Sequence, residues 1–280
     1  MRKSKKKTSI IIVLIFLIGL SLLAYPTVSD QWNKIHQTRA IVSHAENVAK
    51  LSEEECETLL SAARAFNENL TGMENRWKLP ADVEEEYNSL LVTDDTAVMA
   101  YLEIPKIKVS LPVYHGTGAA VLQQAIGHLE GTSLPIGGEG THCVLSGHRG
   151  LPSAKLFTDL DRLSEGDTFM IYTLNEVLTY EVDMINIVLP SDMSTLGIEK
   201  GKDLVTLFTC TPYGINTHRL MVRAHRIENA KDSTILVTAE ALQFDETGVA
   251  LCIGVPMLFL ILIGALIMPQ KKHGGLVNRL

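Results

Sequence analysis

The thiol of Cys210 and the guanidinium of Arg219 are the two groups that the sequence pattern best places for covalent chemistry. Leu204–Cys210 alternates like a strand that ends at the thiol, and His218–Arg226 is predicted to return beside it after a seven-residue turn. Such a hairpin leaves Cys210 and Arg219 at the same end of the sheet. Because a nearby cation favours the thiolate and can hydrogen-bond an oxyanion, the pair predicts a nucleophile with an oxyanion stabiliser.

A third candidate, His148, follows directly after the predicted strand His142–Ser146 and lies between two glycines, in the run SGHRG. The glycines allow a close approach of the backbone. An imidazole at the mouth of a strand suits proton transfer near neutral pH. The other histidines are predicted to be structural or to lie outside the catalytic fold: His36, His44, His115, His128, His142, His218, His225 and His273.

No metal or organic cofactor is predicted. His142 and Cys143 precede His148, but alternation along the strand places these two on opposite faces, and no ligand pair has the spacing of a zinc site. The four cysteines give no disulfide framework. Whether Cys56 and Cys143 pair stays open at this point.

The elements that must position these residues are short β-type runs between 100 and 228, separated by turn residues. Their spacing predicts a mostly β fold, a closed or nearly closed barrel with short helices. Helical inserts are expected at Val121–His128 and Ala154–Leu160. The predicted strands are Ala100–Ile104, Val109–Tyr114, His142–Ser146, Thr168–Thr173, Leu178–Ile187, Leu204–Cys210 and Arg219–Arg226.

A helical stalk is predicted before the barrel, over residues 26–70. Apolar residues recur there at helical spacing and divide into two amphipathic helices. The run Ser52-Glu-Glu-Glu55 has the form of a capping box, so the second helix is expected to begin near Ser52. Residues 71–99 form a connector, in which Val83–Leu91 is expected to be a short helix.

Two uncharged apolar segments flank the rest of the chain, Ser9–Tyr25 with 14 apolar residues of 17 and Gly248–Met268 with 17 of 21. Both are long enough to cross a membrane. Lysine and arginine precede the first and follow the second, so the tails 1–8 and 269–280 are expected in the cytoplasm. The sequence thus predicts a two-pass protein of the cell membrane with an extracellular catalytic domain and a linker, 229–247. The first segment could instead be a cleaved signal peptide, although it lacks a clean small-x-small site.

The net charge of −7 and the apolar fraction of 46% are averages over unlike parts of the chain. All 32 carboxylates lie between the two apolar segments together with 17 lysines and arginines, which leaves that part at −15. An acidic domain lacks the basic footprint of a nucleic-acid-binding protein. The two apolar segments exclude a soluble cytosolic protein, and the large polar remainder excludes a fully membrane-embedded transporter.

Several motifs resemble those of the sortase family. The run TLFTC that ends at Cys210 is similar to the family's TLxTC signature, the distance from Cys210 to Arg219 fits its spacing, and SGHRG around His148 resembles its histidine motif. The likeness extends over about 100–228. A second apolar segment after the barrel resembles class C sortases, the pilus-assembling branch, since the housekeeping branch usually has only the N-terminal anchor.

The resemblance implies a cysteine transpeptidase that cleaves an LPxTG-type sorting signal between Thr and Gly. It implies that Cys210 forms a thioacyl-enzyme, that His148 acts as general acid and then base, and that Arg219 holds the substrate and stabilises the oxyanion. The implied partners are pilin or surface-protein precursors that carry the sorting signal, with a Lys amine of a pilin as acceptor. By the same resemblance, Leu189–Gly201 is the expected specificity element.

Many class C sortases carry a lid with an Asp-Pro-aromatic motif over the cysteine, and this chain contains no Asp-Pro dipeptide. The connector segment 72–77 occupies the corresponding region. Two interpretations stay open. In one, Glu74 meets Arg219 while Trp77 covers the thiol; in the other, the segment is a surface loop whose tryptophan packs on the barrel.

Other functions compete with pilus polymerisation. A sortase could attach single proteins to peptidoglycan, and a membrane-anchored cysteine peptidase would use the same thiol and histidine but release its product to water. A non-enzymatic adhesion or scaffold module would use the stalk as a spacer. That module has no need of Cys210, His148 and Arg219 at strand ends.

Overall fold

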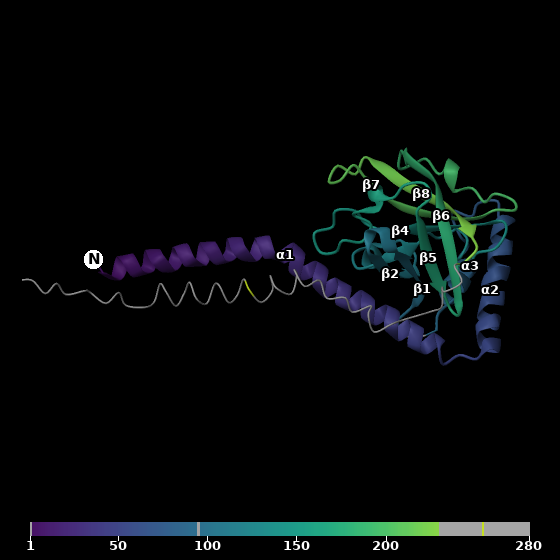
Figure 1. Ribbon diagram of the computed structural model, residues 1–280, viewed down its shortest axis with the longest axis horizontal. Helices are drawn as coiled ribbons and strands as arrows, with labels where there is room; N and C mark the ends of the chain where they lie inside the picture. The colour runs from purple at the N-terminus through teal and green to yellow at the C-terminus, as the bar shows by residue number, and fades with distance from the viewer. Residues whose placement is uncertain (1, 94–95, 230–253, 255–280) are drawn as a thin grey trace, which may run out of the picture. The chain divides into compact units, whose positions relative to one another are not determined.

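The computed structural model describes residues 2–93, 96–229 and 254 (Figure 1). The chain divides into two units, Met1–Leu242 and Gln243–Leu280, and the described residues belong almost wholly to the first. The predicted second membrane segment, 248–268, and the tail 269–280 lie outside the described residues except for Gly254.

Eight strands close into a barrel in the order β1-β2-β3-β4-β7-β8-β6-β5 (Figure 1). The pairs β2–β3 and β4–β7 are parallel, and the other neighbours are antiparallel. The strands are β1 (Val98–Ile104), β2 (Val109–His115), β3 (Ile126–His128), β4 (Thr141–Ser146), β5 (Thr168–Thr173), β6 (Glu176–Val188), β7 (Asp203–Thr211) and β8 (His218–Ile227). This arrangement confirms the closed barrel predicted from the sequence.

The two predicted helical inserts are wrong in most of their length. Within the first, the chain forms one helical turn, α4 (Ala119–Leu122), and then strand β3. All three residues of β3 are buried between β2 and β4, so pairing on both sides overrides the local helical pattern. The second insert consists of turns that lead into a short 3-10 helix, η2 (Leu160–Arg162). The other 3-10 turns are η1 (Pro105–Ile107) and η3 (Ser194–Leu196).

Helix α1 (Arg2–Val48) contains the first apolar segment. Within the described residues, one helix is long and apolar enough to cross a membrane, over Val13–Val48. The apolar side chains near its middle are open to the surroundings, as Leu22 and Leu23 are 70% and 80% exposed, whereas Ile41 is only 5% exposed. The later turns of α1 therefore pack on the barrel, and the earlier ones have an apolar surface that nothing in the described chain covers.

Helix α2 (Glu53–Thr71) begins where the capping box predicts. Ser52 Oγ accepts from the Glu55 N–H at 3.2 Å, and the Glu55 carboxylate accepts from the Ser52 N–H at 2.8 Å. The buried face of α2, which includes Phe66, joins the apolar core of the barrel. Asn67 on that face bonds both backbone groups of Leu134, at 2.7 and 3.4 Å.

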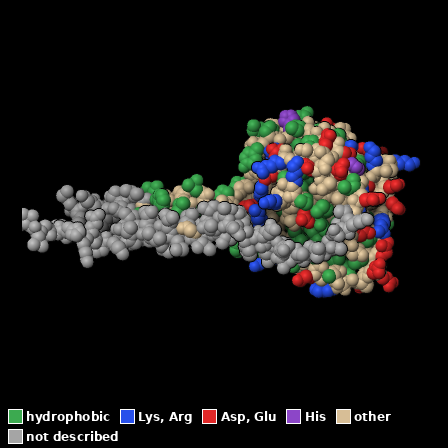
Figure 2. Space-filling model, in the orientation of Figure 1, with side chains coloured by type: hydrophobic (Ala, Val, Ile, Leu, Met, Phe, Trp, Pro, Cys, Tyr) green, Lys and Arg blue, Asp and Glu red, His purple; other side chains and the backbone are tan. Residues whose placement is uncertain are grey.

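Figure 2 shows acidic side chains gathered along the edge at which α2 runs in Figure 1, and a group of basic side chains on the opposite side of the same view. The first turn of α2 alone carries Glu53, Glu54 and Glu55, at the end where the helix dipole favours negative charge. The charge of the described surface is therefore unevenly distributed over the barrel and its helices.

Helix α3 (Ala81–Ser89) is fixed to the barrel by a buried polar chain through Tyr87. The Gly116 N–H donates to the Tyr87 hydroxyl at 3.0 Å, and the hydroxyl contacts His128 Nδ1 at 3.0 Å. His128 Nε2 lies 2.8 Å from the Ser133 carbonyl oxygen, which can only accept, so Nε2 carries the proton and Nδ1 accepts from Tyr87. Burial lowers the pKa of His128 to about 4, so its ring stays neutral.

We expect His128 to make the stability of the chain depend on acid. Its folded pKa of about 4 lies below its ordinary value of 6.5, so unfolding takes up a proton as the pH falls from 6.5 to 4. This contribution to stability is complete above pH 6.5 and is lost progressively toward pH 4. The free energy of unfolding in urea, measured in detergent across this range, should fall less steeply with pH in His128→Gln than in the unaltered chain; equal slopes would contradict the neutral buried ring.

Candidate active site

Cys210 and Arg219 face each other across the β7–β8 hairpin. They are register partners in the antiparallel ladder, a position in which Cβ atoms lie about 4.5–5.5 Å apart. Both residues are half-buried, and the thiol is free. Arg219 Nη1 donates to the carbonyl oxygens of Asn216 and His218 at 3.2 and 3.1 Å, which holds the guanidinium at the turn end of the hairpin. An accessible thiol thus lies beside a fixed cation.

The parallel pairing of β4 with β7 brings His148 to the same end. Ser146 lies opposite Phe208, and His148 and Cys210 are each two residues beyond that pair. The Gly147 N–H donates to the Phe208 carbonyl at 3.1 Å, so the strands remain together one residue past the ladder. His148 is half-buried. The structure therefore gathers all three residues that the sequence singled out for catalysis at one end of the barrel.

The buried hydroxyl of Thr209 joins β7, the strand that carries Cys210, to the loop after β4 that carries His148. This loop, residues 147–159, is called the histidine loop below. Its Oγ1 donates to the Gly147 carbonyl at 2.7 Å. Gly147 itself has no room for a side chain, because a Cβ there would lie 2.8 Å from the Phe157 ring and 2.9 Å from Ile126. Sequence reasoning did not assign Thr209 a role. A hydroxyl at an inward-facing strand position next to the thiol is the signal that could have found it, since buried polar groups require partners.

Arg149 also stabilises the catalytic end of the barrel, and the sequence pattern did not indicate this role. Its Nη1 donates to Thr211 Oγ1 at 3.0 Å, and its Nη2 forms an ion pair with Asp161 at 2.5 Å. The Arg149 side chain is only 9% exposed. The loop after β4 is closed by a further bond, from the Phe157 N–H to the His148 carbonyl at 3.1 Å. The histidine loop is therefore held to the end of β7 and folded back on itself.

Cys210 ends an outward-facing row of side chains on β7. Leu207 points into the main barrel core, whereas Phe208 packs on a separate apolar cluster that contains Leu196. Since strand side chains alternate, Cys210 lies on the face of Phe208. Leu196 belongs to the predicted specificity segment Leu189–Gly201, in the connection between β6 and β7. That connection therefore lies over the row of residues that leads to the thiol.

His142 holds this connection in place. Its Nδ1 lies 2.8 Å from the Gly197 carbonyl oxygen and its Nε2 lies 2.8 Å from Thr206 Oγ1, so both ring nitrogens have partners. Burial lowers the pKa of His142, and the neutral ring donates to the carbonyl and accepts from the hydroxyl. Within residues 2–93 and 96–229, no group of three or more His, Cys, Asp or Glu side chains is arranged to hold a metal ion.

The connector between α2 and α3, which holds Glu74 and Trp77, is bound to two other loops of the barrel domain. Arg76 Nη2 donates to the Leu196 carbonyl at 2.6 Å. The Arg76 backbone lies so close to Gly131 that a Cβ there would be 2.0 Å from the Arg76 carbonyl oxygen. The connector is thus held against the turn between β3 and β4 and against the β6–β7 connection.

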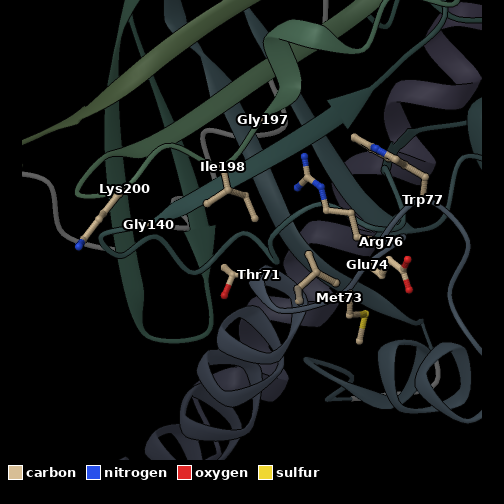
Figure 3. A pocket seen from close by; sticks show the side chains of 10 residues that line it. Thr71, Met73, Glu74, Arg76, Trp77, Gly140, Gly197, Ile198 and Lys200 are labelled. Carbon is tan, nitrogen blue, oxygen red and sulfur yellow. The ribbon is translucent and has the colours of Figure 1, made fainter.

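Glu74 and Trp77 line a cavity of about 580 Å³ beside this contact (Figure 3). The other walls come from the end of α2, from Met73 and Arg76 of the connector, and from Gly140, Gly197, Ile198 and Lys200. The Trp77 ring is 42% exposed and lies 4.4 Å from the Arg76 guanidinium carbon. Among the described residues, no hydrogen bond or ion pair links Glu74 or Trp77 to Cys210 or Arg219. The contacts of the connector are instead with Leu196, Gly131 and the walls of this cavity.

A closed barrel with a free thiol at the same end as an arginine and a histidine is an arrangement suited to nucleophilic chemistry at cysteine. The Sortase domain family matches residues 102–227. Sortase C1 of Streptococcus agalactiae is 49% identical with a TM-score of 0.67, over 69% of this chain and 100% of that one. Sortase C of Streptococcus pneumoniae is 40% identical with a TM-score of 0.61, over 68% and 97%. The chain belongs to the sortase family, whose members are cysteine transpeptidases, and its structural neighbours are class C sortases.

A curated relative shares a shorter stretch. Sortase D of Bacillus subtilis (strain 168) is 34% identical over 112 residues, which is 40% of this chain and 54% of the relative. The chain thus spans about half the length of this relative.

We expect Thr209→Val to weaken the catalytic end of the barrel. Valine keeps the shape of threonine but leaves the buried Gly147 carbonyl without its donor, which costs about 1–3 kcal/mol. The free energy of unfolding, measured in urea at pH 7, should fall by this amount. Thr209→Ser keeps the hydroxyl and serves as the control, with a smaller loss. Equal losses in the two variants would show that the methyl group, not the hydrogen bond, matters.

A Trp77→Ala variant decides whether the connector acts as a lid. A lid over Cys210 predicts faster labelling by a thiol reagent after the ring is removed. From the contacts of Trp77 we expect an unchanged rate, since its neighbours are Arg76 and the walls of the cavity. Labelling is followed by mass spectrometry, and Cys210→Ala gives the background from the other thiols. A clear acceleration would restore the lid hypothesis for Glu74 and Trp77.

Proposed function

We propose that this chain is a membrane-anchored cysteine transpeptidase that cleaves an LPxTG-type sorting signal between Thr and Gly and transfers it to a Lys amine of a pilin subunit. The observation that carries the proposal is the convergence of Cys210, His148 and Arg219 at one end of a sortase barrel. The three groups supply a nucleophile, a proton carrier and a cation, which is the set that acyl transfer requires.

Cys210 is the nucleophile of the first half-reaction. Its thiolate attacks the carbonyl carbon of the Thr residue, and the negative charge that develops on the carbonyl oxygen is stabilised by Arg219. His148 gives a proton to the nitrogen of the departing Gly as the C–N bond breaks. The products are a thioester on Cys210 and a free amine.

The second half-reaction reverses these roles. A Lys amine attacks the thioester carbon, His148 accepts a proton from the attacking nitrogen, and the sulfur of Cys210 leaves as thiolate. An isopeptide bond forms and the enzyme returns to its starting state. Since one amide replaces another, no ATP is needed.

Two observations support the choice of acceptor and location. The similar sortase C of Streptococcus pneumoniae is described in terms of pilin substrate specificity, which favours a pilin over peptidoglycan as the acceptor here. The long apolar part of α1 supports anchoring in the membrane. With a second span over 248–268, both termini would lie in the cytoplasm and the barrel outside the cell.

The test is a transfer assay with the full chain in detergent, an LPxTG-type peptide and a Lys-bearing pilin segment. We expect cleavage after Thr, a thioester adduct on Cys210 and an isopeptide product, all identified by mass spectrometry. Cys210→Ala should abolish all three, and Arg219→Ala should lower kcat by about 10²–10³-fold through loss of an oxyanion donor. Cys56→Ala, which removes a buried thiol on α2, is the matched control and should retain activity.

Each competing function gives a different result in this assay. Hydrolysis that persists unchanged at saturating amine would indicate a cysteine peptidase. Transfer to a peptidoglycan-type amine but not to the pilin lysine would indicate anchoring of single proteins. Pilus assembly that survives Cys210→Ala in cells would indicate a scaffold without catalytic chemistry.

A further inference from the structure

Helix α1 meets the barrel at the end that holds the catalytic residues. Asn33 Nδ2 donates to the Ser153 carbonyl at 2.7 Å, and the Asp30 carboxylate accepts from the Lys155 N–H at 2.7 Å. Both partners belong to the loop after β4 that carries His148. The helix that contains the apolar segment is thus bonded directly to the histidine loop.

A second contact places α1 at the same end. Gln37 Nε2 donates to the Gln124 carbonyl at 2.6 Å, and Gln124 precedes β3, where Gly127 pairs with Ser146 at the end of β4. Farther along α1, Ile41 is buried against the barrel. Counted from the apolar segment, α1 therefore passes the catalytic end of β4 before it runs on along the barrel.

The distance along α1 from the apolar segment to this contact is short. Asp30 lies five residues after Tyr25, the end of the apolar segment, which is about 7.5 Å along a helix axis. The headgroup layer on each side of a bilayer is roughly 5–7 Å thick. A bilayer that contains the apolar segment therefore has the Asp30 carboxylate, and the loop it binds, at the outer edge of its headgroups.

The β7–β8 connection adds exposed apolar side chains at the same end. Tyr213 and Ile215 are 60% and 67% exposed. The Tyr213 ring lies against Gly150 of the histidine loop, where a Cβ would be 2.8 Å from the ring. At the end of β6, Ile187 and Leu189 are 64% and 58% exposed. Tyrosine beside aliphatic side chains is the composition found at membrane interfaces.

The exposed side chains of Ile187, Leu189, Tyr213 and Ile215 are called the apolar rim below. The distribution of charge around this rim favours a lipid surface as its binding partner. The connection 212–217, with the sequence PYGINT, contains no charged residue, although the part of the chain between the apolar segments carries −15. The histidine loop and η2 together carry three cations, Arg149, Lys155 and Arg162, against the carboxylates of Asp159 and Asp161, a net charge of +1. The acidic edge of Figure 2 lies along α2 instead. An uncharged apolar tip beside a loop of net positive charge suits an anionic headgroup layer better than the acidic edge does.

We propose that the barrel docks with its catalytic end on the bilayer that α1 spans, and that Tyr213 and Ile215 enter the headgroup layer. The proposal rests on membrane anchoring by α1 and not on the chemistry of Cys210. Its consequence is that the peptide bond to be cleaved must be presented to the thiol close to the membrane surface, so that substrate reaches the site along the plane of the membrane.

Tryptophan fluorescence in vesicles tests the docking directly, because the chain contains only Trp32 and Trp77. Ile215→Trp is made in a Trp32→Phe, Trp77→Phe background, and the full chain is reconstituted into vesicles of anionic phospholipid with and without bromine near the headgroup. We expect bromine to quench this tryptophan by about the same fraction as Tyr25→Trp, at the end of the apolar segment, in the same background. Glu139→Trp in this background, in the exposed turn before β4 at its other end, is the matched control and should stay unquenched.

The outcomes are separable from those of the transfer assay. Quenching at position 25 without quenching at position 215 would overturn the docking and would point to substrate as the occupant of the rim. No quenching at position 25 would remove the anchoring on which the proposal rests and so overturn it too. Quenching at positions 215 and 139 alike would show a barrel without a preferred face, which also contradicts it. Since Cys210→Ala leaves the rim intact, the same quenching in that variant is expected whether or not the chain transfers peptides.

Discussion

The in-register parallel pairing of β4 with β7 is the constraint on which the catalytic end depends. Six pairs run from Thr141 and Asp203 to Ser146 and Phe208. A slip of one residue would turn every side chain of β7 to the opposite face and bury the thiol in the barrel core. Two polar bonds prevent this slip, since Thr206 is bonded to His142 on one face and Thr209 to the backbone before His148 on the other. The threonines of the TLFTC run thus fix the geometry that the cysteine uses.

Hydrogen bonds of buried polar groups also fix the helices that precede the barrel to the barrel itself. Asn67 bonds the backbone of Leu134 from α2, and Tyr87 reaches His128 from α3. A buried polar group that loses its partner costs more than an apolar contact of similar size, so such bonds select one position for each helix. The helical segment before the barrel is consequently not a free spacer: α1, α2 and α3 are each bonded to the barrel or to its loops.

Much of this arrangement is predictable from the sequence. The features that are not predictable depend on which distant segments pair in space, and local patterns do not contain that information. The run Thr168–Thr173 forms a strand where expected, and burial alternates along most of it. The convergence of Cys210 with Arg219 follows from the hairpin alone. The three-residue strand β3 was not predictable, because it exists only through pairing with β2 and β4. The roles of Thr209 and Arg149 depend on which segments meet in space, and the place of Trp77 depends on the anchoring of its neighbour Arg76 to the backbone of Leu196.

The closure of the sheet has a consequence for how any peptide can be recognised. Many peptide-binding domains bind an extended ligand by adding it as a further strand to an open sheet edge, so that main-chain hydrogen bonds supply the affinity. A barrel in which all eight strands have two neighbours offers no such edge. Recognition of a peptide then falls to side chains and to the loops at the ends of the strands. Related barrels could therefore diverge in ligand preference through such loops while the strands that hold the thiol stay unchanged.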